Sequence, residues 1–170
     1  MENLYTNDCI RTFTGKYMNV FAPTHDMICI EDIAHGLANQ CRFGGHLPMF
    51  YSVAQHSYEA LNFAAEGHEL QVLMHDASEA YLMDIPKPIK NKLSNYKEIE
   101  DSLMRVIADK FGFPYPLSLA TKDIDNHMLQ WEWESLMLNS GILPEINVDG
   151  RGMAKHIFLN RFYSITTKTK

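Results

Sequence analysis

Val72-Leu-Met-His-Asp-Ala-Ser-Glu-Ala-Tyr81 is the stretch that decides the fold, because it sets an imidazole and two carboxylates into an apolar run. We predict a helix here, on which His75 and Asp76 lie about 100° apart and converge on one ion. Glu79 follows one turn later on the same face. Apolar residues cover the opposite side, so the helix is expected to cross the interior of the domain. Burying these charges is costly without a partner, and a cation would be such a partner.

Length and composition favour a single domain that spans residues 1–170. The net charge is −6 and the basic residues are scattered, so we expect neither duplex nucleic acid nor a membrane as a partner. The three cysteines are an odd number without Cys-x-x-Cys spacing, which argues against disulfides and against a thiolate zinc site. No basic leader and no apolar run of about 20 residues is visible, so a cytoplasmic location is expected.

Most of the chain is predicted to form an all-α helical bundle that follows an N-terminal arm of about residues 1–30. Alternating β-branched and polar residues around Gly15 give this arm the pattern of a short β-hairpin, with an irregular segment as the alternative. The helix of the opening stretch should stop near Asp84, because Pro86 and Pro88 cannot continue it. Further helices are predicted over residues 31–40, 52–65, 95–111, 118–138 and 153–164, with a loop over 139–150.

Three predicted helices direct polar residues inward, namely His56, then His75 with Asp76, then Asp125. A single histidine on an apolar face is usually a hydrogen-bonded core residue, but four such residues together need a common purpose. Imidazole nitrogens and carboxylate oxygens suit Zn, Co, Mn, Fe or Ni better than calcium, which prefers oxygen alone. Asp123 is the alternative to Asp125. The sequence therefore predicts a site for a divalent metal ion.

The pattern His…His-Asp…Asp resembles the HD-domain metal-dependent phosphohydrolases. The resemblance is closest to the small bacterial 5′-deoxynucleotidases and the phage dATP triphosphohydrolases. It covers most of the chain and includes the segments Ile30-Glu-Asp-Ile-Ala-His35, Cys41-Arg-Phe-Gly-Gly-His46, Tyr51-Ser-Val-Ala-Gln-His-Ser57, His75-Asp-Ala-Ser-Glu79 and Asp84-Ile-Pro-Lys-Pro88. It implies an HD-domain bundle that forms a homo-oligomer, dimer or higher, in the cytoplasm, or in the host cytoplasm for a phage protein.

The implied activity is hydrolysis of a (deoxy)nucleotide, in which a metal-activated water attacks the phosphate of a dNMP or the α-phosphate of a dNTP. A triphosphate would bring a second ion, Mg²⁺. The resemblance assigns Glu79 as the catalytic acid/base and Asp84 as an aspartate close to the substrate. The spacing of Lys122 and Glu132 around Asp125 matches the family and favours this aspartate over its neighbour. The metal ligands implied are His56, His75, Asp76 and Asp125.

The expected substrate contacts lie in two segments. By resemblance, Arg42 contacts a substrate phosphate, for which its planar donor fork is suited. Phe43 stands where the family members compared have a tryptophan against the sugar, so strict deoxy selectivity is not implied. Gly45 is expected to enlarge the base pocket. Lys87 is assigned to phosphate by its chemistry alone.

Two other interpretations are compatible with the same residues. One is hydrolysis of an alarmone or a cyclic nucleotide, and the other is a non-catalytic nucleotide-sensing HD module. Retention of Glu79 favours an enzyme, because a binding module has little need of an acid/base beside a metal. Trp131 and Trp133 are interpreted as core residues with a role in subunit contact.

Overall fold

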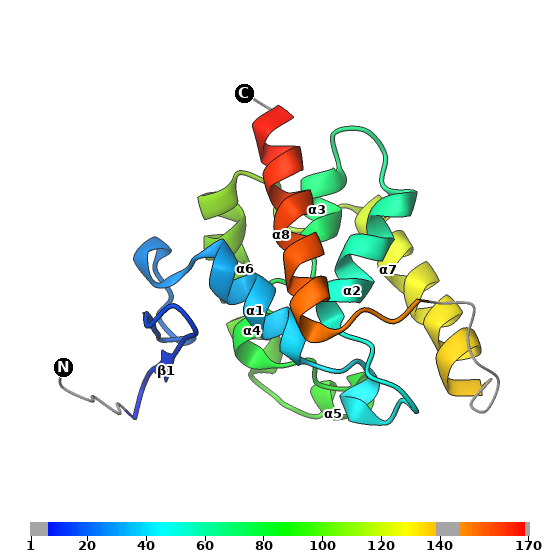
Figure 1. Cartoon of the computed structure of the whole chain (residues 1–170). Coiled ribbons are helices and arrows are strands. Elements are labelled where there is room, and N and C mark those ends of the chain that lie inside the picture. Colours follow the sequence, from blue (N-terminus) through cyan, green and yellow to red (C-terminus); the bar gives the residue numbers. More distant parts are fainter. Residues whose placement is uncertain (1–6, 139–146, 169–170) are drawn as a thin grey trace.

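The computed structural model describes residues 7–138 and 147–168, and over these the chain is mostly helical (Figure 1). The prediction of an all-α bundle with a short β-hairpin arm is confirmed. None of the described helices has the length and apolarity needed to cross a membrane. In chain order the elements are β1 (Ile10–Arg11), β2 (Tyr17–Met18), the 3₁₀ turn η1 (His25–Met27), α1 (Ile30–Asn39), the 3₁₀ turn η2 (Phe43–Gly45), α2 (Val53–Glu59), the 3₁₀ turn η3 (Ala60–Phe63), α3 (Glu69–Leu73), α4 (Glu79–Leu82), α5 (Lys87–Lys90), α6 (Tyr96–Phe111), α7 (Leu119–Glu132), the π-helical segment η4 (Trp133–Leu138) and α8 (Arg151–Lys168).

The N-terminal hairpin is joined to α1 by a buried carboxylate. β1 and β2 pair antiparallel, with Ile10 opposite Met18. In the turn between them, the Thr12 hydroxyl donates to Asp32 at 2.8 Å and the Thr14 backbone N–H donates to it at 2.7 Å. Asp32 lies in the first turn of α1, where the helix dipole favours a negative charge. The hairpin is therefore attached to the bundle by hydrogen bonds as well as by the chain connection.

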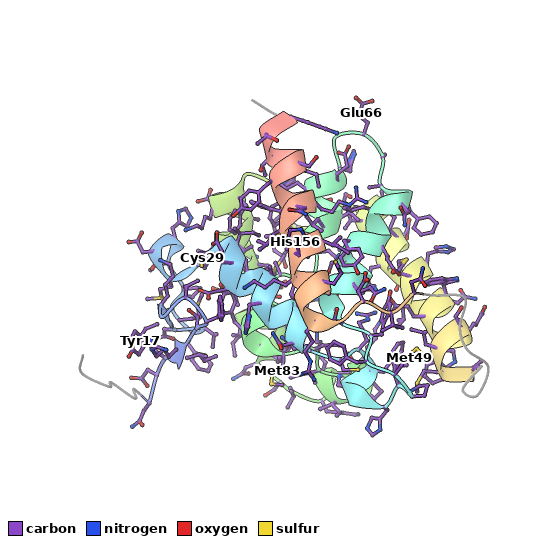
Figure 2. All side chains as sticks on the ribbon, in the orientation of Figure 1. Tyr17, Cys29, Met49, Glu66, Met83 and His156 are labelled. Carbon is purple, nitrogen blue, oxygen red and sulfur yellow. The ribbon has the colours of Figure 1, made fainter. Side chains whose placement is uncertain are left out.

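The main hydrophobic core lies beneath α8, which packs against α1, α2 and α3 (Figure 1). Ala154 and Phe158 on its inner face are fully buried. The helix runs from Arg151 to Lys168, longer than the predicted range of 153–164. Side chains fill the space between these helices, whereas Glu66, in the loop before α3, points away from the body (Figure 2).

The helix predicted through the His75 stretch is not continuous, so this prediction was wrong. α3 ends at Leu73, α4 begins at Glu79, and residues 74–78 form turns. At the break, His75 Nδ1 lies 2.6 Å from the Val72 carbonyl oxygen, which in a continuous α-helix would accept the backbone N–H of Asp76. The His75 side chain thus competes with the backbone for one acceptor, and residues 74–78 form turns in place of a continuous helix.

Two other predicted helices each end in a segment of a different helical type. The helix predicted over 52–65 becomes α2 followed by η3, and the Ser52 hydroxyl caps α2 by accepting the Gln55 N–H. The helix predicted over 118–138 becomes α7 followed by η4. The Pro86–Pro88 segment forms the single-turn helix α5, which the sequence reading did not predict. Residues 139–146 of the predicted loop lie outside the described residues.

Candidate metal centre

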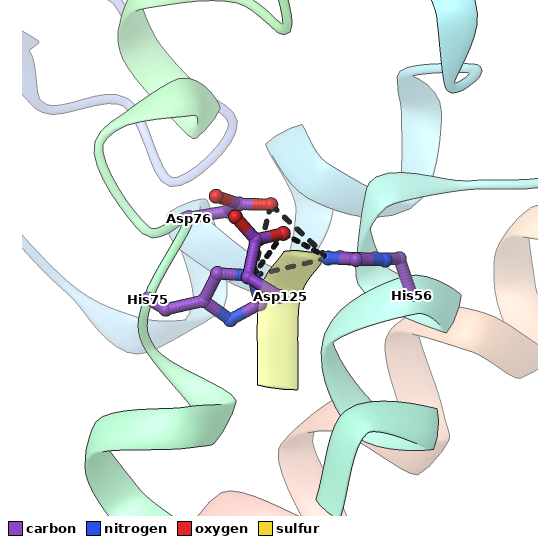
Figure 3. Close-up of side chains that lie close together, drawn as sticks. All are labelled: His56, His75, Asp76 and Asp125. Atoms are coloured by element: carbon purple, nitrogen blue, oxygen red, sulfur yellow. Dashed lines mark hydrogen bonds and ion pairs between the residues drawn. The ribbon is translucent and has the colours of Figure 1, made fainter. Parts of the chain in front are cut away.

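Four ligand-type side chains converge at the centre of the bundle from three separate segments (Figure 3). His56 comes from α2, His75 and Asp76 from the 74–78 turns, and Asp125 from α7. His56 Nε2 lies 3.0 Å from His75 Nε2 and 3.3 Å from Asp125 Oδ1. His75 Nε2 lies 3.3 Å from Asp76 Oδ2. The four ligand atoms all lie within 4.8 Å of one another.

These separations fit a bound divalent ion. An ion about 2.1 Å from each donor, with angles between ligands of about 90–109°, places neighbouring donors about 3.0–3.4 Å apart. The histidine-to-histidine and the closest histidine-to-aspartate separations, 3.0–3.3 Å, fall in this range. Asp123 is not part of the cluster, and Asp125 is. Mixed nitrogen and oxygen donors favour a transition metal or zinc over calcium.

Partners outside the cluster orient both imidazole rings. His56 Nδ1 lies 2.6 Å from Glu132 Oε1, and His75 Nδ1 lies 2.6 Å from the Val72 carbonyl oxygen. Carbonyl and ionised carboxylate oxygens only accept hydrogen bonds, so each ring carries its proton on Nδ1 and presents the Nε2 lone pair to the cluster. Such an arrangement is typical of metal-binding histidines.

Glu132 contacts both His56 and Arg42, although the sequence analysis used it only for its spacing from Asp125. It is fully buried, and its second oxygen accepts hydrogen bonds from Arg42 Nε at 3.1 Å and Nη2 at 2.9 Å. Burial alone would raise the pKa of Glu132, but His56 and Arg42 outweigh it and hold the pKa below its ordinary value. The signal in the sequence was its position two helical turns after Asp125, on the same face of one helix.

The electrostatics of the cluster favour a positive charge at its centre. Burial would lower the pKa of His75, but the Asp76 and Asp125 carboxylates outweigh it and raise this pKa well above its ordinary value. Burial would likewise raise the pKa of Asp76, and His75 instead lowers it to about 2. Without a metal ion the site therefore attracts a proton, and a divalent cation would satisfy the same carboxylates.

Glu79 lies beside the cluster but outside it. Its carboxyl is buried, Oε1 accepts a hydrogen bond from Lys90 Nζ at 3.2 Å, and Oε2 has no hydrogen-bond partner among the described residues. Burial, followed by the negative charges of Asp76 and Asp84, raises the pKa of Glu79 well above its ordinary value, against the opposing effect of Lys90. A carboxyl whose pKa is raised in this way holds its proton more strongly and can act as an acid.

Two residues that sequence reasoning did not single out hold Glu79 and Asp84 in place. Lys90 on α5 bridges Glu79 and Glu100, with 2.9 Å between its Nζ and Glu100 Oε1. Gln40, after the end of α1, donates to the Glu79 carbonyl oxygen at 2.8 Å and accepts the Asp84 backbone N–H at 2.8 Å. No local sequence pattern reveals these contacts, because each of them joins separate elements.

Arg42 makes more contacts with protein carboxylates than is expected of a side chain that binds a substrate phosphate. Nε and Nη2 are bound to Glu132, and Nη1 lies 3.5 Å from Asp76 Oδ2. Burial would lower the pKa of Arg42, but Glu132 and Asp76 outweigh it and raise this pKa, so the guanidinium stays charged. Arg42 therefore lies next to the cluster, and Nη1 is the guanidinium nitrogen that faces Asp76.

Two cavities that are lined by described residues meet at the cluster. The larger, of about 880 Å³, has the volume of a small-molecule site, and the smaller is about 190 Å³. Asp76, Glu79, Lys90 and Asp125 line both. Of the remaining predicted site residues, Arg42, Phe43, Asp84 and Lys87 line the larger cavity.

Gly45 is placed differently from the expectation for it. It lines neither of these cavities and is exposed, and a Cβ added there would meet no atom within 4 Å. Its φ of +81° shows that the turn needs its backbone conformation. Trp131 and Trp133, interpreted from the sequence as core residues, are instead partly exposed, at 38% and 45%.

The fold and this cluster define an all-α protein with a buried site able to hold a divalent metal ion. No family model matches the chain. It is 43% identical over 132 residues to the uncharacterized protein YfdR of Escherichia coli K12, an alignment that covers 78% of this chain and 74% of that protein. It is 33% identical over 140 residues to the uncharacterized protein RCAP_rcc00048 of Rhodobacter capsulatus, covering 74% of this chain and 71% of that protein. The chain belongs to the family of YfdR.

Proposed function

We propose that this protein is a metal-dependent phosphohydrolase of nucleotides, with deoxynucleotides as the preferred class. One observation carries the proposal: the four-residue cluster, with both histidine Nε2 atoms directed inward, lies beside a buried carboxyl that is not part of the cluster. A metal-binding module needs the cluster, whereas a hydrolase also needs a group that moves a proton. Glu79 is that group.

The residues in and around the cluster have separate roles in the proposed reaction. A divalent ion held by His56, His75, Asp76 and Asp125 would withdraw charge from a phosphoryl group and lower the pKa of a water molecule. The Glu79 carboxyl, through its unpartnered Oε2, holds or donates the proton that hydrolysis transfers. Lys90 and Gln40 keep Glu79 in position. Arg42 Nη1 supplies a fixed positive charge beside the cluster, and Lys87 supplies another at the exposed rim of the larger cavity.

The larger cavity suits a substrate with one charged end. Its charged lining residues include Asp76 and Asp125 of the cluster and Glu79 beside it, and its volume of about 880 Å³ accommodates a nucleotide. Water attacks the phosphate of a dNMP or the α-phosphate of a dNTP. A dNTP would bring a second metal ion, Mg²⁺. We place the reaction in the cytoplasm and expect a homo-oligomer.

The experiment that tests this function is product analysis by chromatography. Protein loaded separately with Zn, Co, Mn, Fe or Ni is incubated with paired ribo- and deoxynucleotides as mono- and triphosphates. We expect release of phosphate or triphosphate with at least one metal and a preference for the deoxy member of a pair. Turnover limited to alarmones or cyclic nucleotides, or nucleotide binding without turnover by any metal form, would contradict the proposal.

A further inference from the structure

A stripe of α7 and its continuation faces the larger cavity and does not take part in the metal cluster. Asn126, Leu129, Gln130 and Trp133 all line this cavity, at spacings of three, four and seven residues from the first. Residues so spaced share one face of a helix. The stripe therefore presents two amides, an aliphatic side chain and an indole to the same space. The end of α7 lies at the same side of the molecule as α5 and η2, which line the cavity as well (Figure 1).

The helical winding changes at Trp133, which lies at the end of the stripe on α7. η4 is π-helical from Trp133 to Leu138, and π-helical turns often occur at functional sites. Leu136 within it is 1% exposed and packs with Leu47 and Tyr51. This packing fixes η4 against the segment that carries Phe43. Trp133 itself stays 45% exposed and lines the larger cavity, so part of its surface is not covered by the packing of η4.

Three consecutive contacts lead from the metal cluster to this indole. Arg42 Nη1 is 3.5 Å from Asp76 Oδ2, the Arg42 guanidinium carbon lies 5.8 Å from the centre of the Phe43 ring, and that ring lies 6.0 Å from the Trp133 ring. The cavity wall thus changes from charged to aromatic with increasing distance from the cluster. A ligand that fits this order has an anionic group at one end and a flat aromatic group at the other.

We propose that the outer part of the larger cavity is a nucleobase site in which the base stacks on Trp133. This inference rests on the proposed function, because it assigns the base end of the nucleotide whose phosphate end lies at the cluster. Stacking on an aromatic side chain contributes to binding of any base, because every base has a π-face. Asn126 and Gln130 offer amide donors and acceptors to the base edge. Trp133 is thus the main affinity determinant for the base, and recognition tolerates both purines and pyrimidines.

The test compares two tryptophan variants on two substrates. Trp131→Ala is the matched control, because Trp131 is also partly exposed on α7 and lines neither cavity. We expect Trp133→Ala to lower kcat/KM for dAMP by about 5- to 150-fold, the range for loss of one base-stacking contact. For 2-deoxyribose 5-phosphate, which has no base, it should match the parent protein. Trp131→Ala should match the parent on both substrates. Equal losses of Trp133→Ala on both substrates, or no loss on dAMP, would overturn the inference.

A binding measurement keeps this inference separable from the proposed function. The chain has two tryptophans, so Trp131→Phe leaves Trp133 as the sole indole. Titration of this metal-loaded variant with deoxyadenosine, which has no phosphate to hydrolyse, should quench its fluorescence, and titration with deoxyribose should not. Quenching in a protein that hydrolyses no nucleotide would defeat the proposed function alone. Nucleotide hydrolysis without quenching would defeat the base site alone.

Discussion

His56 and His75 face each other through their Nε2 atoms at 3.0 Å, and in both rings Nδ1 already donates its proton to a protein acceptor. The acceptors are the Glu132 carboxylate and the Val72 carbonyl, neither of which can give a proton back. In their neutral forms the two rings thus direct lone pairs at each other, which is unfavourable. A cation between them removes this repulsion, and the adjacent Asp76 and Asp125 oxygens supply the charge to bind it.

Removal of a ligand should remove the metal. His75→Ala or Asp76→Ala is expected to reduce bound metal from about one ion per chain to near zero, measured by elemental analysis, and to abolish turnover. His127→Ala is the control, since His127 is an exposed α7 histidine that contacts Phe63 and lies outside the cluster. Full activity in chelator-treated parent protein would show that the cluster serves another purpose.

Glu132→Gln should weaken metal binding without removing a ligand. The amide keeps the size of the side chain but not the negative charge that orients and polarises His56, so affinity should fall about 10- to 100-fold in a competition titration with a metal indicator. Glu134→Gln is the control, because Glu134 is exposed and bonds to Gln130. Equal affinities of both variants would remove Glu132 from the metal centre.

Glu79→Gln should separate chemistry from metal binding. Because Glu79 is outside the ligand cluster, the variant should retain its metal and lose about 10²- to 10⁴-fold in kcat, the usual scale for a proton-transferring group. Glu100→Gln leaves the Lys90–Glu79 contact in place and should change kcat far less. Parental turnover by Glu79→Gln would refute its catalytic role, and loss of metal would make it a ligand instead.

The stability of the metal-free protein and the stabilisation that metal provides should change in opposite directions with pH. The raised pKa of His75 stabilises the metal-free fold at acidic pH, and this contribution is lost as pH rises through the raised value. The lowered pKa of Asp76 stabilises the fold above its ordinary value of 3.8 and is lost as pH falls to about 2. The metal-free protein should therefore be most stable in mildly acid solution.

Metal must displace the proton on His75, so its stabilising effect should grow with pH. Thermal unfolding from pH 5.5 to 8.5, with and without Co²⁺, measures this effect as a difference in Tm. The difference should increase toward alkaline pH in the parent protein and be absent in His75→Ala. A difference that is constant with pH would mean that His75 is not the competing group.

The sequence predicted well which four side chains converge, because residue type and inward periodicity are local properties. His56 and Asp125 lie on helices whose apolar faces are readable from the chain alone. The break between α3 and α4 was not readable in this way, because it depends on whether one ring nitrogen binds the Val72 carbonyl. The four residues converge in spite of that break, since the turns at 74–78 direct His75 and Asp76 to the same point.

Residues that support the ligands were harder to predict than the ligands. Glu132 contacts a histidine 76 positions away, and Gln40 contacts Glu79 39 positions away. Such pairs are set by the packing of whole helices. Of these two residues, only Glu132 has a local signal, its spacing from Asp125 on one face of α7. Trp133 was misjudged because aromatic residues on a helix are most often buried, whereas this one lies on the face of α7 that lines a cavity.

Gly36 is expected to control how closely α1 approaches α4, and with it the position of Glu79. A Cβ at Gly36 would lie 2.7 Å from the Ala80 carbonyl oxygen and 3.0 Å from its Cα and Cβ, so Gly36→Ala forces backbone apart. Overpacking of this kind costs about 1–3 kcal/mol in the free energy of unfolding, measured by urea denaturation. Gly152→Ala is the matched control on α8, where a Cβ meets nothing within 4 Å and alanine should be neutral or stabilising by up to about 1 kcal/mol. Because α4 begins at Glu79, the folded Gly36→Ala protein should also lose turnover while it retains its metal, and unchanged stability would show that the contact adjusts freely.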